Sequence, residues 1–212
     1  MGSREKMAHY TVTQAQREAQ QAASPAYQRL LSLLDEQSYV SLDSYVVSNP
    51  QAGIDRPAIA GDGVYTGSGT IDNRLVYVAA QDPAVYGGSM GQRHAEKIIK
   101  VIERARASGV PFIGLYETGG VRIDEGLAAL EAVSSVLQAL QAASGEVPLL
   151  SIVYGPCAGS AALLAGLSDL TILAADRGAL TLNGPGVLAA LANKPLTPVD
   201  LGGYAVQGQK TG

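Results

Sequence analysis

Residues 148–167 read PLLSIVYGPCAGSAALLAGL, an uncharged run with glycine and proline in its middle. Pro148–Tyr154 has the length and the β-branched content of a buried strand, and Gly155–Gly159 has the composition of a turn. The small residues of Ser160–Leu167 favour a short helix that packs closely against its neighbours. The run is long enough to cross a membrane, but its central turn residues and the charge at Asp169 favour strand, turn and helix.

The preceding stretch repeats the same unit. Pro111–Tyr116 is predicted to be a strand, Glu117–Asp124 a glycine-rich turn and Glu125–Ala143 a helix. Leu170–Ala174 follows the second unit as a third strand. Strands that alternate with helices through short loops form parallel, right-handed units. The sequence therefore predicts an α/β fold with a mainly parallel sheet.

A hairpin and a helix come before these units. Gly63–Thr70 and Leu75–Gln81 are predicted strands, and the turn residues of Ile71–Arg74 connect them. Gln92–Ser108 has apolar residues spaced three and four apart, which predicts an amphipathic helix. Gly109 is its expected C-terminal cap.

The N-terminal end is polar and has no apolar signal core. We expect residues 1–25 to form a helical arm, with a vector remnant at residues 1–6, and residues 26–212 to form the domain. Ser24 before Pro25 is a typical helix start, because proline is tolerated at the first helical position.

The C-terminal end, residues 179–212, has a β-like beginning, a turn at Asn183–Gly186 and no obvious terminal helix. We therefore expect a partial chain or a split subunit. The predicted helix Glu125–Ala143 is apolar on more than one face, which predicts a large subunit interface. The apolar residues that cover more than one face of this helix, called the apolar surplus below, are Leu127, Leu130, Val133, Val136, Leu137 and Leu140.

The composition excludes several classes of protein. The chain has 212 residues, 15 Lys and Arg against 19 Asp and Glu, a formal net charge of −4 and no basic block, so nothing indicates a nucleic-acid surface. One cysteine and two histidines exclude a disulfide framework and a Cys/His zinc site. We expect a cytoplasmic protein that binds neither nucleic acid nor membrane, and we predict no metal site.

The first candidate site is Gly155–Ser160, which has the G-x-C-x-G layout of a nucleophile elbow. A thiol nucleophile at Cys157 needs an activating histidine, and neither histidine is placed to serve it, so a structural cysteine is favoured. Alternatively, unpaired amides of Gly159 and Ser160 at the positive end of the helix stabilise an oxyanion. It is also possible that the small residues only allow close packing.

Two further glycine-rich turns are candidates. Gly119 and Gly120 follow a parallel strand at the carboxyl edge of the sheet, where α/β proteins bind ligands. Arg122 suits a phosphate or carboxylate, and pairing with Asp124 or Glu125 explains it equally well. Gly87–Gly91 before a helix is similar to a phosphate cradle, but it lacks the P-loop lysine and the dinucleotide glycine spacing.

Taken in order, these segments resemble the carboxyltransferase family, the crotonase-like subunits of biotin-dependent acyl-CoA carboxylases and of malonate decarboxylase. The motifs that carry the resemblance are Tyr86-Gly-Gly-Ser-Met-Gly91 with His94-Ala-Glu-Lys-Ile98, Thr118–Gly126, Gly155–Gly159, Asn183-Gly-Pro185 and Asp200-Leu-Gly-Gly203. The resemblance covers residues 27–212 and implies a crotonase (ClpP-like) fold of stacked ββα units with an N-terminal helical arm.

The resemblance also implies a site. The amides of Gly159 and Ser160 would form an oxyanion hole, with Gly119 and Gly120 beside it, for the enolate of a CoA or acyl-carrier thioester. The carboxyl group would move to or from biotin on a carrier, with no covalently bound cofactor in this chain. The residues implied in substrate binding are Gly88, Val121, Arg122, Cys157, Ala158, Asn183 and Gly184.

Some positions depart from the family's pattern. Ser160 stands where acyl-CoA carboxylases usually have glycine, so the amide is kept and the hydroxyl narrows the site. Val121 and Leu182–Pro185 look like the malonate decarboxylase β subunit, whereas His94–Lys97 looks like the biotin-dependent enzymes. The family has two crotonase halves and this sequence matches the first. We therefore expect an oligomer with a second crotonase-type half or subunit, and a biotin carrier or acyl-carrier protein as a partner.

Three other functions remain as alternatives. One is a malonate decarboxylase β subunit that decarboxylates malonyl-acyl-carrier protein without biotin. Another is a non-catalytic scaffold subunit, which would not bind a thioester. A crotonase-type hydratase or isomerase would need an acidic residue on Ser160–Leu167, and that helix has none.

Overall fold

The predicted hairpin and both strand–helix units join into one mixed sheet of seven strands. The computed structural model describes residues 14–15, 17–48 and 59–211, so the expected vector remnant at residues 1–6 lies outside the described residues. The strand order is β1-β2-β3-β4-β5-β6, with β7 paired to β5. The strands are β1 (Val40–Leu42), β2 (Val64–Ile71), β3 (Arg74–Gln81), β4 (Phe112–Thr118), β5 (Leu149–Ala158), β6 (Leu170–Leu173) and β7 (Ala179–Thr181).

The sheet is antiparallel on the hairpin side and parallel elsewhere. β1, β2 and β3 pair antiparallel, whereas the β3–β4, β4–β5, β5–β6 and β5–β7 pairs are parallel. The predicted hairpin and the mainly parallel sheet are confirmed. The hairpin turn is shorter than predicted, because only Asp72 and Asn73 connect the strands, with φ of 51° and 63°. This left-handed conformation at both positions is typical of a two-residue hairpin turn.

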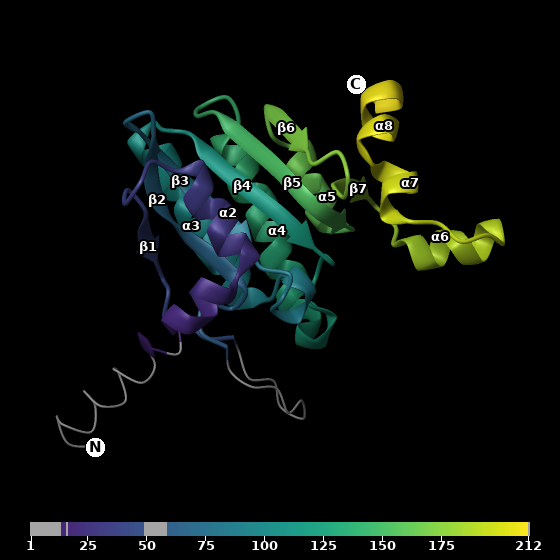
Figure 1. The fold of residues 1–212 in the computed structure, drawn as a ribbon, viewed down its shortest axis with the longest axis horizontal. Coiled ribbons are helices and arrows are strands. Elements are labelled where there is room, and N and C mark those ends of the chain that lie inside the picture. The colour runs from purple at the N-terminus through teal and green to yellow at the C-terminus, as the bar shows by residue number, and fades with distance from the viewer. Residues whose placement is uncertain (1–13, 16, 49–58, 212) are drawn as a thin grey trace, which may run out of the picture.

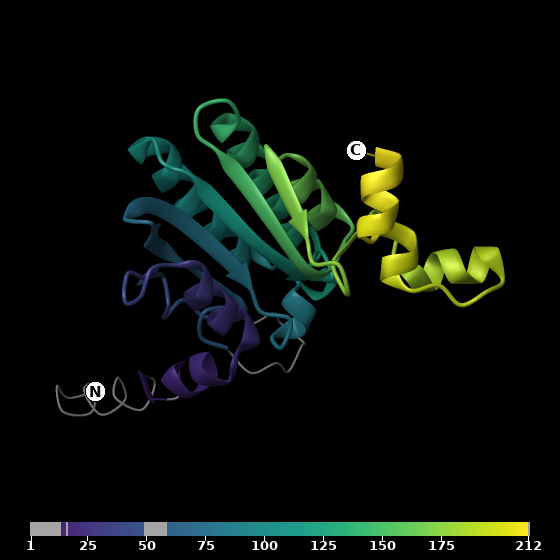
Figure 2. The same ribbon diagram turned by 45° about the horizontal axis from the view of Figure 1, so that its top comes forward.

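Helices cover the two faces of the sheet unequally (Figure 1), and the tilted view shows the same two layers (Figure 2). Among the described residues, three helices and the main core lie on one face, and a helix near the N-terminus covers part of the other face over β3 and β4. The helices of the first face are α3 (Gln92–Ser108), α4 (Gly126–Ala143) and α5 (Ser160–Gly166), and the helix of the other face is α2 (Pro25–Leu33).

The caps of α2 and α3 agree with the sequence. Ser24 accepts a hydrogen bond from the Tyr27 amide at 3.2 Å, and Pro25 takes the first helical position. Gly109 ends α3 in the left-handed conformation with φ of 65°. The predicted apolar face of α3 is buried, with the side chains of Ala95, Ile98, Ile102 and Ala105 at 0% exposure and Ile99 packed against the same core.

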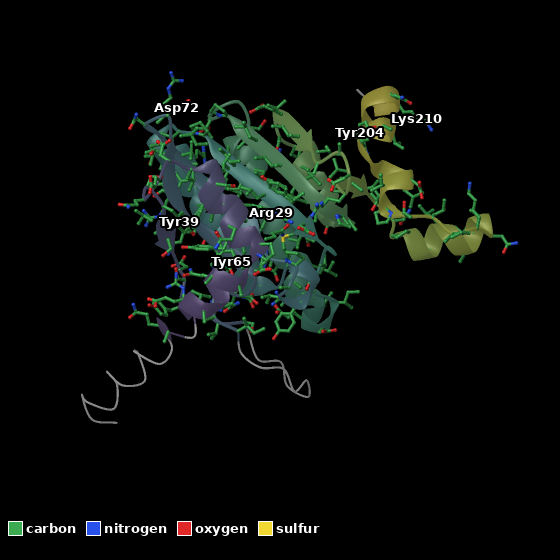
Figure 3. All side chains as sticks on the ribbon, in the orientation of Figure 1. Arg29, Tyr39, Tyr65, Asp72, Tyr204 and Lys210 are labelled. Carbon is green, nitrogen blue, oxygen red and sulfur yellow. The ribbon has the colours of Figure 1, made fainter. Side chains whose placement is uncertain are left out.

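An ion pair ties α2 to the carboxyl edge of the sheet. Arg29 Nη1 lies 2.5 Å from Glu117 Oε2 at the end of β4, and the guanidinium lies 4.8 Å from the centre of the Tyr154 ring. Figure 3 labels Arg29 on α2. The helix is therefore fixed near the end of the sheet where the candidate site lies.

The predicted turn at Gly155–Gly159 is wrong. β5 continues through this segment to Ala158, because it has a parallel partner on each side. Cys157 pairs with Thr118 in β4 and with Leu180 in β7. The chain turns only at Gly159, whose φ of 65° and ψ of −138° suit glycine.

The C-terminal end also differs from the prediction. In place of a simple turn at Asn183–Gly186, Gly184 precedes a helix that starts at Pro185, and further helical turns follow. These helices lie beyond β7, outside the sandwich of sheet and helices (Figure 1). The expectation of no terminal helix is therefore wrong. The elements are α6 (Pro185–Ala192), α7 (Pro198–Gly202), α8 (Tyr204–Val206) and a π-helical turn (Gln207–Thr211).

One apolar helix among the described residues, Ile123–Ala143, is long and apolar enough to cross a membrane by length and composition. A core helix of a globular domain has the same properties, and Val133, Val136 and Leu140 on this helix are buried in the main core. The helix is therefore weak evidence for a membrane span.

Candidate functional site

The two glycine-rich segments predicted to form a site do meet, at the carboxyl ends of β4 and β5. Thr118 pairs with Cys157, and the next residues bring Gly120 against the Ala158 carbonyl. A β-carbon at Gly120 would lie 2.9 Å from that oxygen, and the φ of Gly120 is 98°. Both the close approach and the backbone conformation require glycine at this position.

The amides at the start of α5 are partly used by the fold. The Gly159 amide donates to Thr181 O at 2.9 Å, so the prediction that this amide is unpaired is wrong. The bond exists because β7 runs beside the end of β5. The Ser160 and Ala161 amides have no hydrogen-bond acceptor in the part of the chain that the structure describes. The open donor pair is therefore displaced by one residue from the predicted pair.

The expected exposed amides of Gly119 and Gly120 are also wrong. The Gly119 amide donates to Gly87 O at 3.0 Å, and the Gly120 amide donates to Thr118 Oγ1 at 3.0 Å. Gly88 is buried, and a β-carbon there would collide with Glu117 O, so it serves close packing. These glycines form the wall of the site without offering free donors.

Val121 continues this wall beside the loop that precedes α3. Met90 forms a parallel bridge with Val121, in which the Met90 amide donates to Gly120 O and the Arg122 amide donates to Met90 O, both at 2.8 Å. The peptide groups of an extended chain alternate in direction, so the Val121 amide points away from Met90. Val121 is half-buried, as is Ala158 opposite.

Arg122 lies behind the wall instead of facing a ligand. Its side chain is 3% exposed, and its Nη1 lies 2.5 Å from Asp62 Oδ1 and 2.9 Å from Glu125 Oε1. The predicted contact of Arg122 with substrate is therefore wrong, and the alternative of pairing with Glu125 is confirmed. Asp62 is the partner that the sequence does not reveal, because it lies 60 residues away.

His94 is part of the same buried network. Its Nδ1 lies 2.9 Å from Asp62 O, and its Nε2 lies 3.2 Å from Gln81 Nε2, which fits a neutral ring that donates from Nδ1 and accepts at Nε2. Burial, and then the nearby Arg122 charge, lowers the pKa of His94 to about 3. Burial also lowers the pKa of Lys97 to about 7, and its ammonium donates to Gly61 O and Val64 O.

Cys157 is sealed inside the core. Its side chain is 0% exposed, and burial raises the pKa of its thiol to about 12. A thiol with this pKa is not ionised at neutral pH and is therefore not a nucleophile. Because the side chain is buried, substrate cannot reach it. The structural interpretation of Cys157 is supported, and the predicted substrate contact is contradicted.

Asn183 and Gly184 follow β7, two and three residues after the carbonyl that binds the Gly159 amide. Asn183 is exposed, and Gly184 is the N-cap residue of α6 without a side-chain cap. Their predicted contact with substrate stays a prediction. Asp62 and Gln81 are network residues that the sequence analysis missed, since only tertiary structure brings them to His94.

This arrangement can be compared with known proteins. The family model of the carboxyl transferase domain matches residues 17–212. The chain belongs to the carboxyl transferase domain family. The match begins ten residues before the predicted start at residue 27 and confirms the resemblance.

Relatives in the carboxyl transferase family support the same assignment. The propionyl-CoA carboxylase beta chain of Cereibacter sphaeroides is 39% identical over 187 residues, 88% of this chain and 37% of that protein. The methylmalonyl-CoA decarboxylase subunit alpha of Veillonella parvula is 37% identical over 193 residues, 91% of this chain and 38% of that protein. This chain therefore spans less than two fifths of the length of either relative.

Solved structures also match the fold, including a transcarboxylase and a malonate decarboxylase. A transcarboxylase 12S hexamer with methylmalonyl-coenzyme A and methylmalonic acid bound has a TM-score of 0.85 and 32% identity over 98% of this chain and 42% of that chain. A Pseudomonas malonate decarboxylase hetero-tetramer in complex with malonate has a TM-score of 0.79 and 27% identity over 90% of this chain and 77% of that chain. The predicted crotonase-like α/β fold is confirmed.

Proposed function

We propose that this chain forms one half of a carboxyl-transfer site for an acyl thioester, with the Ser160 and Ala161 amides as its oxyanion hole. The observation that carries the proposal is that these neighbouring N–H groups have no acceptor among the described residues. They lie at the positive end of α5, where an oxygen that gains negative charge is stabilised. Ser160 Oγ is also buried and has no hydrogen-bond partner among the described residues.

The chemistry follows from where negative charge develops. Loss of a carboxyl group from the carbon beside a thioester carbonyl leaves an enolate. In the other direction, gain of a carboxyl group requires removal of a proton from that carbon, and biotin N1′ takes the proton as it gives up its carboxyl group. In both directions the enolate oxygen needs hydrogen-bond donors and no protein nucleophile. The chain fits this requirement, because Gly120 and Ala158 present backbone and small groups while Arg122, His94 and Cys157 are buried. Biotin on a separate carrier would supply or take the carboxyl group, and its ring carbonyl is an acceptor that such amides suit.

The substrate class is proposed from the relatives. Their names include propionyl-CoA carboxylase and methylmalonyl-CoA decarboxylase, and the transcarboxylase structure holds methylmalonyl-coenzyme A. A CoA thioester of a short acyl group is therefore the substrate that we propose for the open amides.

A second candidate is the decarboxylation of a malonyl-acyl-carrier thioester without biotin. The matched solved structures include a malonate decarboxylase in complex with malonate. Val121 and the Leu182–Pro185 run favour the same enzyme. The two candidates share the oxyanion hole and differ in what receives the carboxyl group.

We also propose that a second crotonase-type half or subunit completes the site, in a cytoplasmic oligomer. Carboxyl transfer has two reactants with carbonyl oxygens, and the Ser160 and Ala161 amides offer an oxyanion hole to one of them. Part of the predicted apolar surplus is available for an interface, because Leu127 and Leu130 are 83% and 53% exposed. The other part is not, because Val133, Val136 and Leu140 belong to the core and Leu137 packs against it.

The test measures binding and turnover separately. Titration calorimetry with methylmalonyl-CoA and malonyl-CoA reports thioester binding, and assays with and without a biotin carrier and the second half report carboxyl transfer and decarboxylation. We expect thioester binding by this chain and turnover only with the second half present. Turnover that needs biotin supports the first candidate, and turnover without biotin supports the second. A chain that binds no thioester and leaves turnover unchanged is a scaffold, which would contradict the proposal.

A further inference from the structure

A buried charged cluster lies directly behind the glycine wall of the proposed site. The cluster consists of Asp62, Arg122 and Glu125, whose side chains are 0%, 3% and 4% exposed. We propose that Arg122 is a positioning residue of the carboxyl-transfer site, which fixes the Gly119–Val121 wall opposite the start of α5. The inference rests on the proposed function and names a residue that acts on the site without touching substrate.

The first support is the reach of the guanidinium. One nitrogen, Nη1, contacts both carboxylates of the cluster, while Nη2 donates to Ser89 O at 2.7 Å. The face of the group lies 4.8 Å from the centre of the Tyr86 ring. Arg122 therefore holds the loop before α3 by its backbone and by an aromatic ring. Only the planar fork of arginine satisfies these directions together, since a lysine ammonium is a single point charge.

The second support is the backbone that this loop holds in turn. Gly87 O accepts from the Gly119 amide, and Met90 bonds to Gly120 and Arg122 on either side of Val121. On that side the wall is held by the bridge between Met90 and Val121 and by the bond from the Gly119 amide to Gly87 O. A displacement of the loop would therefore displace Gly120, which lies against Ala158 just before α5.

The third support is that both carboxylates have a further structural bond. Asp62 Oδ2 accepts from the His94 amide at 2.9 Å, and Glu125 Oε2 accepts from the Gln92 amide at 2.7 Å. Both amides belong to the first turn of α3, so the cluster is fixed to a long helix. Arg122 thus connects the wall to a rigid element, and its burial excludes direct contact with substrate.

The experiment compares Arg122→Lys with two controls. Arg122→Lys keeps the positive charge and loses the planar set of guanidinium donors. We therefore expect hydrogen exchange at the backbone amides of Met90, Gly119 and residue 122 to become faster by about tenfold or more. We also expect kcat to fall by about 10- to 100-fold, because small misplacement of reacting groups has effects of this size. KM should change by less than about threefold, because the wall affects the transition state more than it affects the bound thioester.

The controls separate positioning from general destabilisation. Arg106→Lys alters an exposed arginine that makes two bonds to Glu146 at the far end of α3, so exchange and kcat should stay at wild-type values. Leu140→Ala removes a buried side chain of α4 and lowers stability without touching the cluster. When both variants are assayed at the same interval below their own melting temperatures, the kcat of Leu140→Ala should fall far less than that of Arg122→Lys.

Unchanged exchange in Arg122→Lys would overturn the inference, and so would a loss of kcat in Leu140→Ala as large as in Arg122→Lys. A wild-type protein with no turnover, even with the second half present, would refute the proposed function instead. Exchange at the wall amides would then still decide whether Arg122 positions them.

Discussion

Helices α3 and α5 begin in the same way and yet differ in what their first amides do. Both have a glycine N-cap without a side-chain cap. At α3 the amides of the first turn have acceptors on other segments of the chain. Glu125 accepts a hydrogen bond from the Gln92 amide, and Asp62 accepts one from the His94 amide. Two buried carboxylates and the Arg122 cation between them therefore neutralise the start of this helix.

At α5 no carboxylate takes that place. The Gly159 amide is used by Thr181 O, and the next two, at Ser160 and Ala161, have no acceptor in the described chain. The two starts show that an open helix N-terminus is not a property of the local glycine-rich sequence. Residues distant in sequence decide it, and here they close one helix and leave the other free for a ligand.

The largest expected effect on stability comes from removing a carboxylate that binds the first turn of α3. Asp62→Ala removes a carboxylate that is 0% exposed and that accepts hydrogen bonds from Arg122 and from the His94 amide. We expect the free energy of unfolding, measured by urea titration, to fall by about 3 to 5 kcal/mol, the usual effect of breaking a buried ion pair. The exposed pair of Asp176 with Arg177 provides the control, since Asp176→Ala should leave the urea midpoint unchanged. A midpoint for Asp62→Ala equal to that of wild type would contradict the role of the cluster.

The wall opposite α5 should respond next. Gly120→Ala adds a β-carbon 2.9 Å from Ala158 O at a φ of 98°, so we expect a loss of about 1 to 3 kcal/mol in unfolding free energy. Gly109 is in the left-handed conformation, with φ of 65° and ψ of 33°, and no atom lies within 4 Å of its added β-carbon, so Gly109→Ala should lose only about 1 kcal/mol. Equal losses in the two variants would show that Gly120 is needed only for its backbone conformation.

The pH dependence of stability tests whether His94, in the first turn of α3, is buried in its neutral form. Unfolded histidine takes a proton below its ordinary pKa of 6.5, whereas folded His94 stays neutral down to about 3. The unfolded state therefore binds more protons in this window, and the unfolding free energy falls as the pH falls. His94→Asn, which keeps a donor for Asp62 O, should flatten this fall in urea titrations at pH 7, 6, 5 and 4. A slope equal to that of wild type would count against the neutral, buried histidine.

The smallest effect is expected just before α5. Cys157→Ala should keep most of the turnover, because the thiol is buried and its pKa is raised to about 12. The native protein should also resist alkylation by iodoacetamide at pH 7.5. Rapid alkylation with matching loss of turnover, together with an inactive Cys157→Ala, would restore the thiol nucleophile.

The repeated strand–helix units were predictable because their signals are local. The apolar spacing of Gln92–Ser108 and the left-handed cap at Gly109 need no information beyond the segment itself, and both match the structure. The hairpin is similar, since turn residues between β-branched runs fix its position. These elements are the frame on which the site is built.

The site itself was predictable only in outline. β5 extends through Pro156 and Cys157 because β7 pairs with it there, and this pairing also removes the Gly159 amide from the donors. Arg122 has the composition of a ligand contact, yet Asp62, far away in sequence, turns it inward. Free amides and buried ion pairs depend on tertiary neighbours, so glycine spacing alone locates the site without naming its donors.

The central claim is that the Ser160 and Ala161 amides stabilise the thioester oxyanion, and a single pair of variants tests it most directly. Ser160→Pro removes one of the two N–H groups at the first position of α5, where proline is well tolerated, and Gly159 before it has no β-carbon to clash with the ring. Ser160→Ala removes the hydroxyl and keeps the amide. We predict that kcat of the folded Ser160→Pro protein, assayed with its second half, falls by about 10²- to 10³-fold while Ser160→Ala keeps most of its turnover. A folded Ser160→Pro protein with the kcat of wild type would contradict the claim.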